Sequence, residues 1–267
     1  MSPSERFSIL RATERIWAVA GIHGEAQKLA ALHDEIALDL EFGDRVVYLG
    51  NYFGHGPEPL ETLEELLRFR SWFLAHPPYQ HPDDLVFLRG AQEEMLWKLM
   101  QLQFAPDPPA VLDWMVERGI GTILSGLGFD VADGRKRASE GTLALTYWTN
   151  RIREMTHSLP GYDALFSSLK RAAYTDDGSV LFVHTGLDTS KPLARQADAF
   201  WWAANSFAEI DTPYRGFQKI VRGYDPDHAG FLEGEYTLSI DGGAGFGGTL
   251  NGVLLSQSGE LLREISI

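Results

Sequence analysis

The sequence of 267 residues contains no cysteine. Disulfide bonds and thiolate metal ligands are therefore excluded, and any metal ion would be bound by His, Asp, Glu or Asn side chains. A run of about 18 apolar residues is also missing, so we expect no membrane-spanning helix and no membrane partner. Residues 1–14 are polar and lack the apolar stretch of a secretory signal, which favours a cytoplasmic location.

Basic residues are scarce relative to acidic ones. The chain has 23 Lys and Arg residues against 37 Asp and Glu residues, and its formal net charge is −14. Because such a protein repels phosphate backbones, we expect no nucleic-acid partner. The densest basic segment is Arg135-Lys136-Arg137, and its short length predicts a solvated loop.

Hydrophobic residues make up 44% of the chain, enough for one large domain over residues 1–267. Short apolar runs at residues 15–20, 45–49 and 85–88 predict buried strands. Each is followed by a loop containing glycine and then by apolar residues at helical spacing. Three such units predict an α/β fold with layered sheets.

The second half of the chain changes character. Residues 110–123 and 143–169 have helical patterns, and we assign a helical insert to about residues 104–170. Strands are then expected at residues 180–183, 219–221, 236–240 and 249–256. The glycine-rich run at residues 242–248 predicts a tight turn between strands.

Chemically active groups of layered α/β folds lie on loops at the carboxyl ends of strands. Six segments occupy such places here: Gly21-Ile22-His23-Gly24, Gly50-Asn51-Tyr52-Phe53-Gly54-His55-Gly56-Pro57, Arg89-Gly90-Ala91-Gln92-Glu93, His184-Thr185-Gly186-Leu187, Gly223-Tyr224-Asp225-Pro226 and Asp241-Gly242-Gly243-Ala244.

In order, spacing and neighbours, these segments resemble the motifs of the calcineurin-like metallophosphoesterases, in their bacterial serine/threonine phosphatase and diadenosine-tetraphosphatase branch. The resemblance covers residues 16–260. It implies a layered sandwich of mixed β-sheets flanked by helices, with a two-metal centre that hydrolyses phosphate esters.

The glycines that shape the loops match the family, but the chemical side chains largely do not. The family holds two metals with six side chains, and only two of the matching positions keep the family's residue. Two others have no side-chain donor, one has an amide in place of the bridging carboxylate, and one has a phenol in place of an imidazole. The six positions are Gly21, His23, Asn51, Ala91, His184 and Tyr224.

The catalytic positions are altered as well. Gln92 stands where the family has its proton-donating histidine, and Gly54 where it has the aspartate that orients this histidine. A glutamine cannot donate a proton near neutral pH. His55 stands where the family grips phosphate with an arginine. We therefore expect no catalytic residue, no metal cofactor and no enzymatic activity, and interpret the chain as a pseudophosphatase with a regulatory or binding role.

A binding role would involve another protein or a phosphorylated ligand. The cationic side chains available for an anion at the matching loops are His23, His55, Arg89, His184 and Arg222. A purely structural interpretation also exists for four of them, with His23 and His184 as packed histidines and Arg89 and Arg222 as structural or ion-paired arginines. A subunit with only a structural role in an assembly is a further alternative.

Residual activity is the alternative to a pseudophosphatase. One weakly bound manganese or zinc ion held by His23, Asn51 and His184 would suit a weak or atypical phosphoesterase acting on phosphoproteins or dinucleoside polyphosphates. Neighbouring carboxylates would then complete the site, and the candidates are Glu93, Asp225 and Asp241.

An aromatic cluster formed by Phe200, Trp201, Trp202 and Phe207 also has two interpretations. It is either a core or lid packed over a sheet, or a hydrophobic recognition patch, because exposed tryptophans often anchor interfaces.

Overall fold

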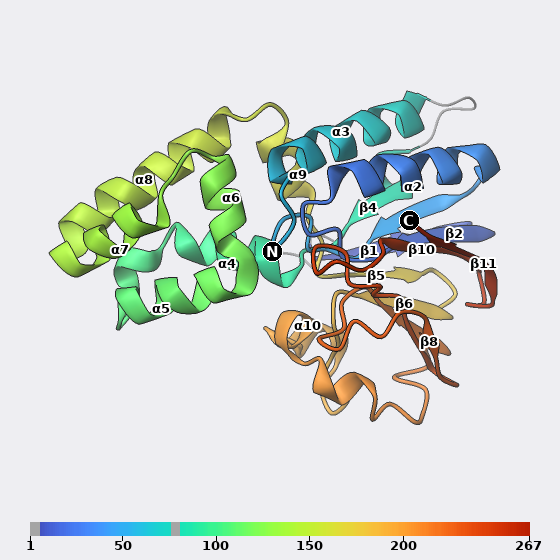
Figure 1. The fold of residues 1–267 in the computed structure, drawn as a ribbon. Coiled ribbons are helices and arrows are strands. Elements are labelled where there is room, and N and C mark those ends of the chain that lie inside the picture. The colour runs from blue at the N-terminus through green and yellow to red at the C-terminus, as the bar shows by residue number, and fades with distance from the viewer. Residues whose placement is uncertain (1–5, 76–80) are drawn as a thin grey trace.

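The computed structural model describes residues 6–75 and 81–267. Five strands form one mixed sheet in the order β11–β10–β2–β3–β4 (Figure 1). Strands β2, β3 and β4 are parallel, whereas β10 is antiparallel to both β2 and β11. The five strands are β2 (Arg15–Val19), β3 (Arg45–Tyr48), β4 (Leu85–Phe87), β10 (Asn251–Ser256) and β11 (Leu261–Ser266).

A second mixed sheet has the strand order β1–β5–β6–β7–β9–β8. The pairs β1–β5, β6–β7 and β7–β9 are parallel, and β5–β6 and β8–β9 are antiparallel. Its strands are β1 (Phe7–Leu10), β5 (Ala172–Thr175), β6 (Val180–Val183), β7 (Lys219–Arg222), β8 (Leu232–Glu233) and β9 (Thr237–Ser239).

Alternation along the strands explains why the two sheets stack. In β2, Ile16 and Ala18 point between the sheets, whereas Trp17 and Val19 join the core under the helices α2 (Ala26–Asp39) and α3 (Pro59–Ala75). Both faces of this strand are buried, so it shows a continuous apolar run instead of a polar alternation. The opposite face of the second sheet is covered by α10 (Ala199–Trp202). The predicted layered α/β sandwich is confirmed.

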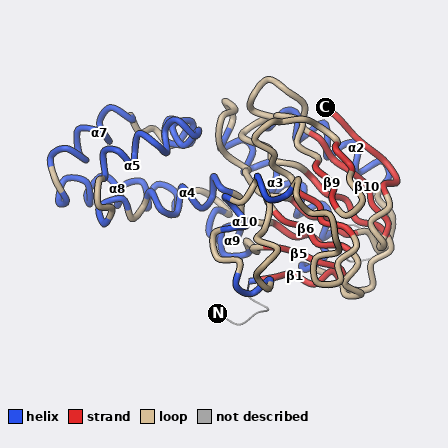
Figure 2. The backbone as a smooth tube through the Cα atoms, turned by 90° about the horizontal axis from the view of Figure 1, so that it is seen from below, coloured by secondary structure: helices blue, strands red, loops and turns tan. Residues whose placement is uncertain are grey.

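Between β4 and β5 the chain is mostly helical, and most of these helices project from the sandwich, whereas the last one packs beside β4 (Figures 1 and 2). They are α4 (Ala91–Leu99), η2 (Leu102–Phe104), α5 (Pro108–Met115), the π turn η3 (Val116–Ile120), α6 (Gly121–Gly126), α7 (Val131–Glu140), α8 (Thr142–Ser158) and α9 (Tyr162–Ser168). The assignment of residues 1–267 to a single domain stays a prediction. The remaining short turns are η1 (Pro82–Asp84), η4 (Leu193–Arg195) and η5 (Asn205–Phe207).

Some local predictions were wrong. Arg135, Lys136 and Arg137 lie in α7 and not in a loop. The helix packs through its buried Gly134 and Ala138, while Arg135 and Arg137 form exposed ion pairs with Asp113 and Asp133. Strands β1, β5 and β11 were missed: β1 and β11 are edge strands, which have weak patterns, and β5 is an inner strand of only four residues. Within the described residues no helix is both long and apolar enough to cross a membrane.

Candidate functional site

The loops that follow β2, β3, β6 and β7 meet at one edge of the sandwich. Backbone hydrogen bonds join them: Gly21 donates to the carbonyl of Gly223, His23 to that of Asn51, and Gly223 to that of His184. The loop after β4 adds its own residues beside them. The structure thereby brings together nine of the predicted positions, which are Gly21, His23, Asn51, Gly54, His55, Ala91, Gln92, His184 and Tyr224.

The amide of Asn51 has a fixed orientation at the centre of this group. Its Oδ1 accepts a hydrogen bond from the backbone N–H of Gln92 at 3.0 Å, so its Nδ2 is the atom that lies 3.2 Å from Nε2 of His23. An amide nitrogen only donates, and therefore Nε2 of His23 accepts. The lone pair that a metal would need on His23 is occupied by a hydrogen bond from Asn51.

This arrangement leaves two buried polar atoms without partners. With Nε2 of His23 accepting, the proton of the neutral ring sits on Nδ1, and this atom has no hydrogen-bond partner in the described part of the chain. Gln92 donates through Nε2 to the carbonyl of Arg118 at 2.6 Å, and its Oε1 is likewise unpartnered. Gly54 packs between the two side chains, since a Cβ there would lie 2.5 Å from Nδ1 of His23. An aspartate at position 54 therefore has no room.

His184 is fully buried and holds its ring by one hydrogen bond. Its Nδ1 lies 2.8 Å from the carbonyl oxygen of Leu49 and must donate, so Nε2 carries a lone pair. No described residue hydrogen-bonds to this Nε2. Tyr224 stacks on the ring with centroids 5.6 Å apart. Burial lowers the pKa of His184 to about 4, so the side chain is neutral at physiological pH.

Phe246 and His228, which the sequence did not single out, complete the site. Phe246 lies between three imidazole rings, with centroid distances of 5.1 Å to His23, 4.2 Å to His55 and 4.1 Å to His228. Burial lowers the pKa of His23 well below its usual value and also lowers the pKa of His55, and the neighbouring histidines act in the same direction. The available signal was a phenylalanine within a run of glycines, because it is the one large side chain in residues 242–248.

A cavity of about 490 Å³ opens over these residues. The loops of the sandwich form its floor, and the helical segment contributes Glu117 and Arg118 from η3. The backbone of η3 comes close to the site: a Cβ at Gly119 would lie 2.9 Å from Nε2 of His55. The aromatic cluster is divided, since Phe200, Trp201 and Phe207 are buried, whereas Trp202 is 40% exposed at the cavity. The core interpretation therefore holds for three residues of the cluster, and the recognition patch stays a prediction for Trp202.

The carboxylates proposed to rebuild a metal site have other partners. Both oxygens of Glu93 accept backbone N–H groups, from Asn51 and Gly90 on Oε2 and from Tyr52 on Oε1, at 2.8–2.9 Å. Burial raises the pKa of Glu93, and these hydrogen bonds oppose that shift.

Asp225 and Asp241 are also engaged. Asp225 pairs with Arg222 at 2.7 Å and accepts a hydrogen bond from the backbone of Asp227. Asp241 accepts hydrogen bonds from the backbone N–H groups of Asp225 and Gly243 and contacts Nδ1 of His228 at 2.8 Å. These carboxylates hold the loops together and direct no free oxygen to a metal.

The arginines predicted as anion ligands do not face the cavity. The guanidinium of Arg222 is buried and contacts Asp225, Ser239 Oγ and the ring of Phe207. Arg89 pairs with Glu94 at 3.1 Å and lines a different cavity. The geometry therefore does not support an anion site built from Arg89 and Arg222, whereas His23, His55 and His184 do lie together.

The side chains present do not fit the metal pair that the resemblance implies. Gly21 and Ala91 supply no ligand atom, and the ligand atoms of Asn51 and His23 are hydrogen-bonded to protein groups. Of the two histidines at the matching ligand positions, only His184 has a ring nitrogen whose lone pair no described residue engages. Over residues 6–75 and 81–267, no group of three or more His, Cys, Asp or Glu side chains is placed to hold a metal ion.

Stability is expected to fall as the pH drops from about 6.5 to 4. The unfolded chain protonates His184 near pH 6.5, whereas the folded chain does so only near its pKa of about 4. The contribution is complete above pH 6.5, and His184 alone accounts for a loss of about 3 kcal/mol by pH 4. Urea unfolding of His184→Asn should show a shallower pH slope. The exposed His81→Asn variant should keep the wild-type slope, and equal slopes in both variants would contradict this assignment.

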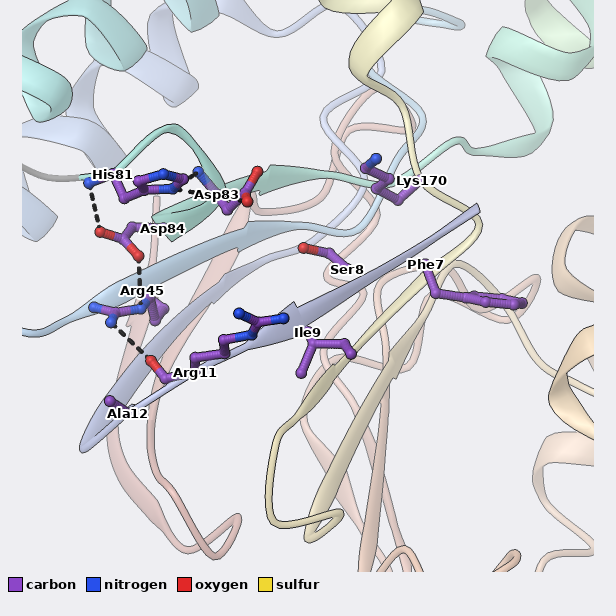
Figure 3. A pocket seen from close by; sticks show the side chains of 10 residues that line it. All are labelled: Phe7, Ser8, Ile9, Arg11, Ala12, Arg45, His81, Asp83, Asp84 and Lys170. Atoms are coloured by element: carbon purple, nitrogen blue, oxygen red, sulfur yellow. Dashed lines mark hydrogen bonds and ion pairs between the residues drawn. The ribbon is translucent and has the colours of Figure 1, made fainter. Parts of the chain in front are cut away.

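A second cavity, of about 450 Å³, lies between β1 and η1 (Figure 3). Arg45 forms an ion pair with Asp84 at 3.0 Å and donates to the carbonyl of Arg11. Asp84 also accepts a hydrogen bond from the backbone N–H of His81. These contacts join a strand edge to a turn, and the residues of the six motifs lie elsewhere.

No protein-family model and no curated protein matches the sequence. Solved structures do resemble the fold. A proposed diadenosine tetraphosphatase is 17% identical, with 98% of each chain covered and a TM-score of 0.57. A serine/threonine phosphatase from Saccharomyces cerevisiae similar to human phosphatase PP5 is 12% identical, with 99% of this chain and 83% of that chain covered and a TM-score of 0.54. A cold-active protein-tyrosine phosphatase from a psychrophilic Shewanella is 12% identical, with 100% and 84% covered and a TM-score of 0.53.

These likenesses extend over nearly the whole chain. The resemblance to metallophosphoesterases is thus confirmed as a resemblance of fold. At identities this low, it is the geometry of the site and not the likeness that bears on chemistry.

Proposed function

We propose that this chain is a catalytically degenerate metallophosphoesterase-like protein that serves as a regulatory or binding protein. The observation that carries the proposal is the amide of Asn51. It directs an N–H group at the lone pair of His23, in the position where the fold's enzymes need a carboxylate between two metals. A donor at this position repels a cation instead of binding it.

The groups needed for proton transfer support the same proposal. Gln92 cannot donate a proton to a leaving group, and its Nε2 is already bonded to the carbonyl of Arg118. His23 and Gln92 pack against Gly54, so position 54 has no room for a carboxylate that would orient a catalytic histidine. Phe246 covers His23 and His55 in place of a solvated metal site.

The retained loops and the cavity above them support a binding role. Dinucleoside polyphosphate or phosphoprotein hydrolysis, the activities that the similar solved proteins suggest, would need a metal site for which these side chains are poorly arranged. Another protein as a partner and a cytoplasmic location remain predictions from the sequence.

Hydrolysis of p-nitrophenyl phosphate with added manganese tests the proposal. We expect the purified protein to show no manganese-dependent rate above that of His184→Ala, which removes a ring nitrogen whose lone pair no described residue engages. A manganese-dependent rate that disappears in His184→Ala would overturn the proposal and would favour the weak phosphoesterase instead.

A further inference from the structure

The cavity over the degenerate site has the dimensions of a small-molecule site. Its volume of about 490 Å³ lies within the range of about 300–1,000 Å³ that is usual for ligand pockets. Its walls come from the sandwich loops, from η3 and from the segment around α10, so three separate parts of the chain enclose it.

The cavity lacks a net charge that would attract a phosphate. Glu117 and Arg118 are the lining side chains with full charges, and they offset each other. The guanidinium of Arg118 lies 4.4 Å from the centroid of the Trp114 ring. This cation–π contact already engages the group that would have to bind an anion. His55 also lines the cavity. Anion binding would therefore lack a counter-charge.

Aromatic side chains form part of the remaining lining, beside the polar residues Asn51, Thr185 and Asn205. Trp201, Trp202, Tyr224 and Phe246 all face the cavity. Trp202 and Phe246 remain 40% and 43% exposed, although side chains of this size usually find cover in a folded protein. Aromatic faces of this kind stack on flat ligands.

One residue of the cavity wall, Gln92, has an acceptor atom without a described hydrogen-bond donor. Gln92 lines the cavity and is 4% exposed, and its Oε1 is buried without a partner among the described residues. The orientation of this amide is fixed, because Nε2 donates to the carbonyl of Arg118. A buried acceptor without a partner is unfavourable, so a ligand that supplies an N–H or O–H group gains from meeting it.

We propose that this cavity binds a neutral, flat molecule that stacks on Trp202 and Phe246 and donates a hydrogen bond to Oε1 of Gln92. The inference deepens the proposed binding role and rests on it. It replaces the phosphorylated ligand expected from the sequence by an uncharged aromatic amide or a molecule of similar chemistry.

Calorimetric titration with four simple probes tests the inference. Benzamide is neutral and flat and has donors, and we expect a dissociation constant on the order of 1 mM for a molecule of this size. N,N-Dimethylbenzamide lacks the donor, benzoate is charged, and cyclohexanecarboxamide is not flat. Each of these should bind about tenfold more weakly, the usual effect of one lost hydrogen bond or stacking contact. Absent benzamide binding, or equal binding of benzoate, would overturn the inference.

Variants identify the site of binding. Gln92→Met removes the acceptor and should abolish the preference for benzamide over its dimethyl derivative, whereas Gln101→Met, outside this cavity, should retain it. Trp202→Ala should weaken the binding of all probes, whereas Trp97→Ala, at a tryptophan that is 49% exposed outside this cavity, should not. An unchanged preference in Gln92→Met would contradict the inference. These results are independent of the manganese assay. If benzamide does not bind, the pseudophosphatase proposal still stands. If manganese-dependent hydrolysis is found, the ligand preference of the cavity can still be measured.

Discussion

Replacing Glu93 by alanine is expected to lower the free energy of unfolding by about 4 kcal/mol or more, because three buried N–H groups then lose their common acceptor. These groups belong to Asn51, Tyr52 and Gly90, and the carboxylate that accepts them is fully buried. Urea unfolding monitored by circular dichroism would measure the loss. The effect should exceed that of an ordinary surface substitution several-fold.

Two further variants make the measurement specific. Glu93→Gln keeps one acceptor oxygen and should lose less stability than Glu93→Ala, which matters if the alanine variant does not fold. Glu61→Ala, exposed in the first turn of α3, should resemble the wild type. If Glu93→Ala were as stable as Glu61→Ala, the carboxylate would not be the clamp between the loops after β3 and β4.

Restoring the family's ligands is expected to create manganese binding, which we propose that the wild type lacks. The four changes are Gly21→Asp, Asn51→Asp, Ala91→Asn and Tyr224→His. Asn51→Asp has the largest role, because it replaces the N–H donor facing His23 by an oxygen and keeps an acceptor for the backbone of Gln92. A side chain at Gly21 meets His23 at 3.3 Å, a contact that a small shift relieves.

Thermal unfolding with and without manganese would measure the result. At a metal concentration about 100 times the dissociation constant, the rebuilt variant should gain about 2.7 kcal/mol, while the wild type should not change. Adding His184→Ala to the rebuilt variant should remove the gain. A wild-type protein stabilised to the same extent, or a rebuilt variant indifferent to manganese, would show that these four positions are not what separates this chain from a metal-binding one.

Much of the fold was predictable because local patterns and the global structure agree. The runs at residues 15–20, 45–49 and 85–88 became β2, β3 and β4, and the apolar spacing of Ala26, Leu29, Leu32 and Ile36 became the buried face of α2. The missed strands β1, β5 and β11 lie at or near the edges of the sheets, where pairing is decided by a distant partner.

The sequence by itself determined which ligand atoms are absent. Gly21 and Ala91 have no donor in any conformation, and Gln92 cannot supply a proton wherever it lies. Tertiary structure alone decided what the remaining polar atoms do, because their partners lie far away along the chain. Glu93 bonds to the backbone 42 residues earlier at Asn51, and Gln92 bonds 26 residues later to Arg118. Such partners depend on how the sheets and the helical segment pack, which composition and spacing do not contain.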